Sequence, residues 1–246
     1  MTDCGPETTR TDACCYVLEH IGWWGAGRPL VVDGRPRLPS VRKLRGRVKN
    51  TLGPRDAGRA AFWTAMARAE HASIASFACF TLELLALGAP AELVASACRA
   101  QADEVVHARI AFRLASRFAG GTLAPGPIDL RRMVGNPDPL ATAQALAREG
   151  CVAETVAAAQ AALALRDATD VEEQGALTRI STDERRHAAL AWRSAAWMLA
   201  TFPETRAIFS DELAAAAVHP ARLPLERRVV AAVVAPCSRA LLGSPR

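Results

Sequence analysis

Two Asp-Glu-x-x-His motifs, at residues 103–107 and 183–187, contain the side chains best suited to chemistry in this chain. In each motif the Glu and the His are three residues apart, so both lie on one face of a helix. A carboxylate and an imidazole placed in this way can bind one metal ion or bridge to a second. Random placement of Glu and His would give roughly 0.3 Glu-x-x-His matches. Two matches, each preceded by Asp, indicate a metal site.

Two further carboxylates complete the candidate site. Glu70 precedes Glu104 by about 34 residues and Glu154 precedes Glu184 by about 30, each the length of half a helix, a turn and another half-helix. Each pair should therefore lie at a similar height. Four carboxylates and two imidazoles form the ligand set of dinuclear iron or manganese sites in helix bundles, and these hard ligands suit Fe or Mn. The predicted ligands are Glu70, Glu104, His107, Glu154, Glu184 and His187.

The Asp of each motif has a supporting role in this hypothesis. A metal-bound His usually donates its other N–H group to a carboxylate, which fixes the tautomer of the ring. We expect Asp183 to reach His107 across the helix interface, and Asp103 to reach His187. The alternative is that both Asp residues are exposed on their helices.

Other acidic residues and one histidine compete for the same roles. Glu149 is the rival of Glu154, which spacing and apolar flanks favour. His71 follows Glu70 directly and so points about 100° away from it on a helix, which favours a helix contact over a seventh ligand. Glu83 should point to another face.

Four long helices should carry these residues, over residues 57–87, 90–118, 140–166 and 170–200. Gly88, Pro90 and the Gly120-Gly121 pair mark helix ends. Asp170 and Glu173 form a candidate capping box at the start of the fourth helix. The connections are short, long and short, which permits a crossover between two antiparallel pairs. The predicted fold is all-α, a four-helix bundle with a long crossover.

The remaining segments are assigned as two extensions of that bundle. Residues 1–56 are rich in Gly, Pro and Arg and predict an irregular N-terminal arm, with a candidate hairpin over residues 28–41 around Asp33-Gly34. Trp23 and Trp24 could pin this arm to the bundle of residues 57–200. Residues 201–246 predict a C-terminal helical extension, whose last helix would be broken at Pro236.

Composition narrows the class of protein further. The formal net charge is +5, and all but Lys43 and Lys49 of the 30 basic residues are Arg. No aromatic residues are interleaved with them as a base-stacking platform requires, so a nucleic-acid partner is disfavoured. The chain has neither an apolar leader nor a run of transmembrane length, which predicts a cytoplasmic protein without a membrane partner.

The seven cysteines are irregularly spaced and contain no Cys-x-x-Cys pair, which argues against a thiolate zinc site. Cys79, Cys98 and Cys151 fall in apolar helical stretches and are interpreted as small core residues. For the adjacent Cys14 and Cys15, a reduced pair and a redox or accessory metal role both stay open.

The pattern Glu … Glu-x-x-His … Glu … Glu-x-x-His over residues 57–200 resembles the ferritin-like di-iron carboxylate superfamily. The resemblance implies that Glu104 and Glu184 are the bridging carboxylates and that two Fe ions are bound, with Mn as the alternative. Residues 27–34 and 70–90 also resemble ferritin-like proteins of bacterial secondary-metabolite producers.

The activity implied is that of a non-haem dinuclear-iron oxidase or oxygenase that uses O₂ to oxidise a small organic substrate. It would need an external electron donor, could form a homodimer, and needs no catalytic residue beyond the ligands. Candidate pocket residues are Gln101, Phe77, Ser73 and Ala158. A radical generator is disfavoured because Tyr16, the only tyrosine, lies outside the bundle. A ferroxidase or iron-binding ferritin-like protein, a dimanganese catalase and a tRNA-modifying hydroxylase remain alternatives.

Overall fold

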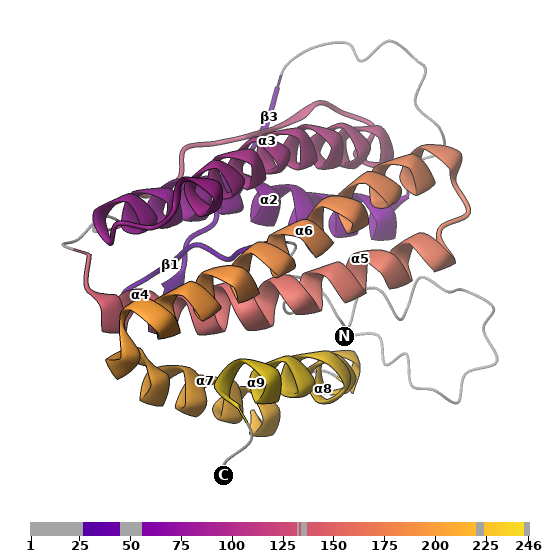
Figure 1. Cartoon of the computed structure of the whole chain (residues 1–246). Coiled ribbons are helices and arrows are strands. Elements are labelled where there is room, and N and C mark those ends of the chain that lie inside the picture. Colours follow the sequence, from indigo (N-terminus) through magenta and orange to yellow (C-terminus); the bar gives the residue numbers. More distant parts are fainter. Residues whose placement is uncertain (1–26, 45–55, 132, 134–136, 220–223, 244–246) are drawn as a thin grey trace.

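The computed structural model describes residues 27–44, 56–131, 133, 137–219 and 224–243, and these residues are mostly helical (Figure 1). The predicted all-α class is therefore confirmed. The interpretations of Trp23, Trp24, Cys14, Cys15 and Tyr16 concern positions outside the described residues.

The first helix pair is α2 (Ala57–Ala86) and α3 (Ala91–Ala119), with bounds close to those predicted. The Asp56 side chain caps α2 by accepting a hydrogen bond from the Arg59 N–H group. Gly88, at φ +72°, ends the first helix, and Gly120, at φ +67°, ends the second. The four-residue link between them makes α2 and α3 antiparallel neighbours.

The second pair differs from expectation in one helix. The predicted third helix consists of α4 (Pro139–Ala145), the π-helical segment η1 (Leu146–Glu154) and α5 (Thr155–Asp167). Expecting regular α-helix throughout was wrong here. The π-helical turn at Gly150 packs directly against the next helix, α6 (Val171–Thr201). A Cβ atom added at Gly150 would lie only 2.9 Å from the Ala191 Cβ atom.

Only half of the predicted capping box is present. Asp170 caps α6 by accepting hydrogen bonds from the N–H groups of Glu172 and Glu173. Glu173 does not reach back; its Oε1 atom accepts a hydrogen bond of 2.6 Å from the buried Trp63 indole.

Two apolar clusters fill the space between the helix pairs, one toward each end. One contains Trp63, Leu114 and Ile180, and the other contains Phe77, Leu146 and Met198. On each of α2, α3 and α6, the residues between the two clusters include the predicted metal ligands. The two apolar clusters therefore lie on either side of a layer of polar side chains, halfway along the helices.

The N-terminal arm contains the predicted hairpin. Strands β1 (Val31–Val32) and β2 (Arg35–Pro36) pair antiparallel around Asp33 and Gly34, whose φ angles are +52° and +69°. Positive φ at both turn residues explains the Asp-Gly sequence. Strand β3 (Val41–Lys43) then pairs with β4 (Leu123–Pro125), which ties the arm to the crossover between α3 and α4.

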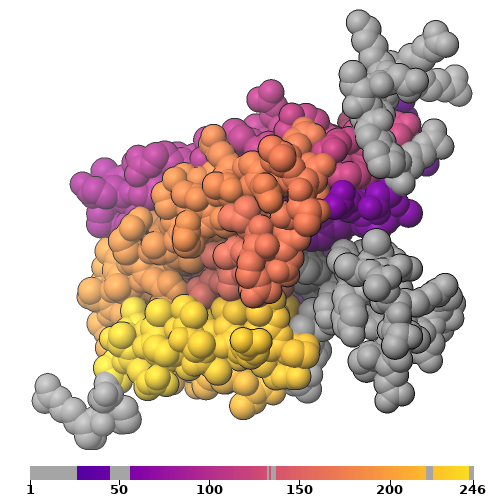
Figure 2. Space-filling view, turned by 90° about the vertical axis from the view of Figure 1, so that its right-hand side faces the viewer, coloured from indigo at the N-terminus to yellow at the C-terminus, as the bar shows by residue number. Residues whose placement is uncertain are grey.

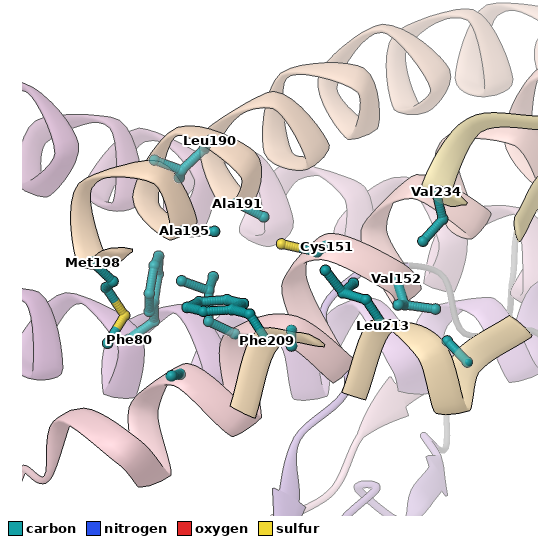
Figure 3. Close-up of a cluster of buried hydrophobic side chains, with 14 of the residues drawn as sticks. Phe80, Cys151, Val152, Leu190, Ala191, Ala195, Met198, Phe209, Leu213 and Val234 are labelled. Carbon is teal, nitrogen blue, oxygen red and sulfur yellow. The ribbon is translucent and has the colours of Figure 1, made fainter. Parts of the chain in front are cut away.

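The C-terminal residues form η2 (Pro203–Thr205), α7 (Arg206–Val218), α8 (Pro224–Val229), η3 (Val230–Val234) and α9 (Ala235–Leu242). Of these, α8, η3 and α9 (yellow in Figure 2) lie against α5 and α6, and α7 lies against α4 and η1. Phe209, Leu213 and Val234 join Cys151 and Val152 in a shared apolar cluster (Figure 3). Regular α-helix is interrupted close to Pro236, as expected, because the π-helical η3 separates α8 from α9 and Pro236 lies in the first turn of α9. No helix in the described part of the chain is long and apolar enough to cross a membrane.

Replacement of Asp170 by Ala should destabilise the fold. Asp170 caps α6 and also accepts two hydrogen bonds, of 2.9 and 2.6 Å, from Arg117 of α3. We expect the free energy of unfolding to fall by about 1–3 kcal/mol, measured by chemical denaturation. Asp167→Ala is the control, because Asp167 is exposed and pairs with its neighbour Arg166. Equal stability of the two variants would contradict the capping role.

Candidate metal centre

All six predicted ligands come together in the buried polar layer. Their candidate ligand atoms form two groups, and within each group the atoms lie within 4.8 Å of one another. One group contains Glu70, Glu104, His107 and Glu184, and the other contains Glu154, Glu184 and His187. Glu184 belongs to both groups, so its carboxylate lies between the two positions. These buried groups can hold metal ions.

The ligand atoms lack ordinary partners. Both carboxylate oxygens of the four Glu residues, and the Nδ1 atoms of both His residues, are buried without a hydrogen-bond partner among the described residues. Leaving so many buried polar atoms unsatisfied is costly, because each has lost its hydration. Bound cations would satisfy all of them at once, so the donor set fits a metal centre.

The distances between these atoms also suit metal binding. His107 Nδ1 lies 3.4 Å from Glu70 Oε2 and 3.6 Å from Glu184 Oε1. His187 Nδ1 lies 3.2 Å from Glu104 Oε1. Ligand atoms about 2 Å from a shared ion are separated by distances of this size. Small side-chain movements would therefore be enough for these oxygen and nitrogen atoms to coordinate one ion.

Electrostatics in the site favour added positive charge. Burial and the nearby Glu104 raise the pKa of Glu70 well above its usual value, and burial and Glu184 do the same for Glu154. Burial alone would lower the pKa of His187, but Glu104, Glu184 and Glu154 outweigh it and raise that pKa to about 11. Four carboxylates in one buried layer therefore draw in protons when no metal ion is bound.

Both Asp residues make the cross-helix contacts that the sequence predicts. Asp183 Oδ2 lies 3.0 Å from His107 Nε2, and Asp103 Oδ2 lies 3.5 Å from His187 Nε2. In each ring Nδ1 faces the carboxylates and Nε2 faces an Asp. Arg186 holds both carboxylates from outside, with Nη2 at 2.7 Å from Asp183 Oδ1 and 3.1 Å from Asp103 Oδ2. Arg186 was not expected here, although its place three residues after Asp183 is a detectable signal.

The rival residues lie elsewhere. Glu149 Oε2 lies 3.8 Å from the Nε atom of buried Arg28, and burial raises the pKa of Glu149 to about 7. His71 packs edge-on against Phe112, with ring centroids 6.5 Å apart. Neither belongs to the two candidate ligand groups. The sequence-based preference for Glu154 over Glu149 agrees with this geometry.

The candidate pocket residues have mixed surroundings. Phe77 is buried, with its ring centroid 5.1 Å from that of His187. Ala158 is buried, and Gln101 is half-buried. The Ser73 hydroxyl is already used, because it donates to the carbonyl oxygen of Arg28 at 2.8 Å. A pocket formed by these residues stays a prediction.

The arm itself forms part of the wall of the site, which sequence analysis missed. Ser73 and Ser76 of α2 donate hydrogen bonds to the carbonyl oxygens of Arg28 and Pro29. Gly27 then lies so close that an added Cβ atom would be 2.8 Å from Ser73 Oγ and 3.1 Å from Glu104 Oε1. No motif or spacing links Gly27 to Glu104, so only the folded structure reveals this contact.

Gly27→Ala should disturb the site through this close approach. Gly34→Ala is a matched control, because both glycines have φ +69° and a Cβ atom at Gly34 would meet nothing within 4 Å. The strain of positive φ is therefore common to both variants. We expect metal affinity, measured by competition with a chelator, to fall at least about tenfold more in Gly27→Ala than in Gly34→Ala. Equal affinities would show that Glu104 does not depend on Gly27.

Metal binding should release protons. The raised pKa values of His107 and His187 mean that both imidazoles are protonated at neutral pH in the metal-free site. A metal ion competes with those protons, so its affinity should rise with pH and fall on acidification. We expect release of roughly two or more protons per chain at pH 7, measured by calorimetry in buffers of different ionisation enthalpy. Metal binding without proton release would contradict this view of the site.

Comparisons with known proteins do not assign the chain to a family. No family model matches it, and neither the curated proteins nor the solved structures contain a significant match. The functional interpretation therefore depends on the geometry of the site.

Proposed function

We propose that this protein is a ferritin-like dinuclear-iron oxidase or oxygenase that uses O₂ to oxidise a small organic substrate. The observation that carries the proposal is the set of buried, unpartnered carboxylate and imidazole atoms in two groups that share Glu184. Four carboxylates with two imidazoles form the ligand pattern of di-iron and di-manganese proteins. The shared carboxylate supports a pair of ions rather than a single one.

The donor atoms favour iron or manganese over zinc. The two candidate groups contain oxygen and imidazole nitrogen donors and no thiolate. Structural zinc sites commonly use cysteine, whereas carboxylate-rich sites suit harder ions. Cys79, Cys98, Cys151 and Cys237 are free and belong to neither group. Iron is the proposed metal, and manganese, which accepts the same ligands, is the alternative.

Each part of the site has a role in this mechanism. Glu70 and His107 would hold one ion, and Glu154 and His187 the other. Glu104 and Glu184 would be available to both, because Glu104 lies 3.8 Å from His107 Nδ1 and 3.2 Å from His187 Nδ1, and Glu184 belongs to both ligand groups. Bound iron would supply the electrons that reduce O₂ and the oxidising power that acts on the substrate. Asp183 and Asp103 would accept hydrogen bonds from the Nε2–H groups of the two His residues, which leaves each Nδ1 atom turned toward the buried carboxylates as a metal ligand.

Burial of the ligands also excludes water from the proposed reaction site. Glu70, Glu104 and His107 are fully buried, and Phe77 packs on the ring of His187. Exclusion of water protects reactive species from side reactions and strengthens every charge interaction in the site. A small substrate and an external electron donor remain part of the proposal.

Removal of one ligand should lower the metal content of the chain by at least half. We expect about two Fe per wild-type chain after anaerobic loading, measured by elemental analysis, and a loss of at least half of it in His187→Ala and Glu104→Gln. The matched controls are His71→Ala and Glu149→Gln, because both residues lie outside the ligand groups. Full metal content in His187→Ala, or its equal loss in His71→Ala, would show that the ligand set is wrong.

The iron-loaded protein should also consume O₂. Addition of O₂ should change its optical spectrum, and substrates can then be sought by following O₂ uptake. A large assembly that stores many Fe per chain would instead favour the ferritin alternative. Rapid disproportionation of hydrogen peroxide by the Mn-loaded protein would favour the catalase alternative.

A further inference from the structure

A basic groove lies between α3 and α6, on the outer side of the candidate metal centre. Its volume is about 550 Å³, and its walls include Arg99, Arg185, Arg186, Arg193, Asp103 and His187. This volume lies within the range of small-molecule sites. The two helices lie side by side, so α3 forms one wall and α6 the other (Figure 1).

The positive charge of this groove is only partly compensated. Arg186 pairs with Asp103 and Asp183. By contrast, Arg99 donates to the Ser96 hydroxyl and Arg185 to the Thr182 hydroxyl, which are neutral partners. No carboxylate among the described residues forms an ion pair with Arg99, Arg185 or Arg193. Three guanidinium groups that share one concave surface repel one another unless an anion joins them.

We propose that this groove binds a small molecule that carries a carboxylate or phosphate group. Guanidinium groups present a planar set of N–H donors that match such oxyanions and remain charged at every physiological pH. Ala100, Ala189 and Leu190 add apolar surface that can contact the body of the molecule. Apart from the almost fully buried His187, the same lining contains no aromatic side chain on which a base could stack, which favours a small anion over a nucleic acid.

The groove is a site separate from the proposed substrate position at the metal ions. It meets His187 on the side of Nε2, where Asp103 lies, whereas Nδ1 faces the carboxylates. His187 is only 2% exposed, so a bound molecule would contact Asp103 and Arg186 and hardly touch the His187 ring itself. It would compete with Asp103 and Asp183 for Arg186. The groove therefore suits an effector that adjusts the hydrogen bonding of a ligand histidine.

The test measures binding of inorganic phosphate and of succinate to the full chain by calorimetry, with sodium chloride at equal ionic strength as the blank. The groove variant is Arg99→Gln/Arg193→Gln. The matched control, Arg109→Gln/Arg166→Gln, removes the same charge from positions outside the groove. We expect at least one anion to bind the wild type, with affinity lowered about tenfold or more in the groove variant and changed less than about twofold in the control.

Several outcomes would overturn the proposal. Absence of binding by both anions would show that the groove is not an anion site. An equal loss of affinity in both double variants would show that net charge, and not the groove, attracts the anion. Binding of a single-stranded oligonucleotide that the groove variant abolishes, without binding of phosphate or succinate, would favour a nucleic-acid site instead.

Metal content measured on the same samples separates this inference from the proposed function. Anion binding by a chain that takes up no Fe or Mn would support the groove and refute the dinuclear centre. Two metal ions per chain without anion binding would support the dinuclear centre and refute the groove as an anion site. The groove variant should keep its metal, because neither Arg99 nor Arg193 belongs to the ligand groups.

Discussion

Four carboxylates buried in one layer impose the constraint on which this structure depends. Charges of like sign in a dry interior repel strongly, and these oxygens find no hydrogen-bond donors among the described residues. Such a layer can be stable only if positive charge enters it, as protons or as metal ions. The rest of the fold suits that requirement, because apolar clusters hold each helix pair together on both sides of the layer.

A second set of contacts connects the buried histidines to charged side chains at the surface. Each histidine turns Nδ1 inward and Nε2 toward an Asp, and Arg186 bridges the two Asp carboxylates. Charge therefore alternates from the buried carboxylates through imidazole and aspartate to guanidinium. This alternation links the interior to the arginine-rich groove on the outer side of α3 and α6.

The sequence predicts those features that depend on local pattern. Gly88 and Gly120 end their helices where expected, Asp33-Gly34 forms the hairpin turn, and Glu-x-x-His spacing brings the candidate ligands together. Features that depend on tertiary packing escaped prediction. Glu173 bonds to Trp63 rather than to its own helix start, and a Cβ atom added at Gly27 would lie 3.1 Å from Glu104 Oε1, although the two residues are far apart in the sequence. Nothing in the local sequence encodes either contact.

The π-helical segment η1 has a consequence for how the chain can vary. Its wider turns hold more residues than an α-helix of equal rotation, and it ends at Glu154. Loss of a single residue between Leu146 and Glu154 could restore regular α-helical winding without changing any ligand type. An α-helix turns by about 100° per residue and the wider π-helix by less, so the shortened segment would turn through a similar total angle and Glu154 would keep its present direction. The segment is therefore a place where the chain can lose one residue and keep its ligands in position, whereas one residue lost from regular α6 before Glu184 would turn the ligands that follow by about 100°.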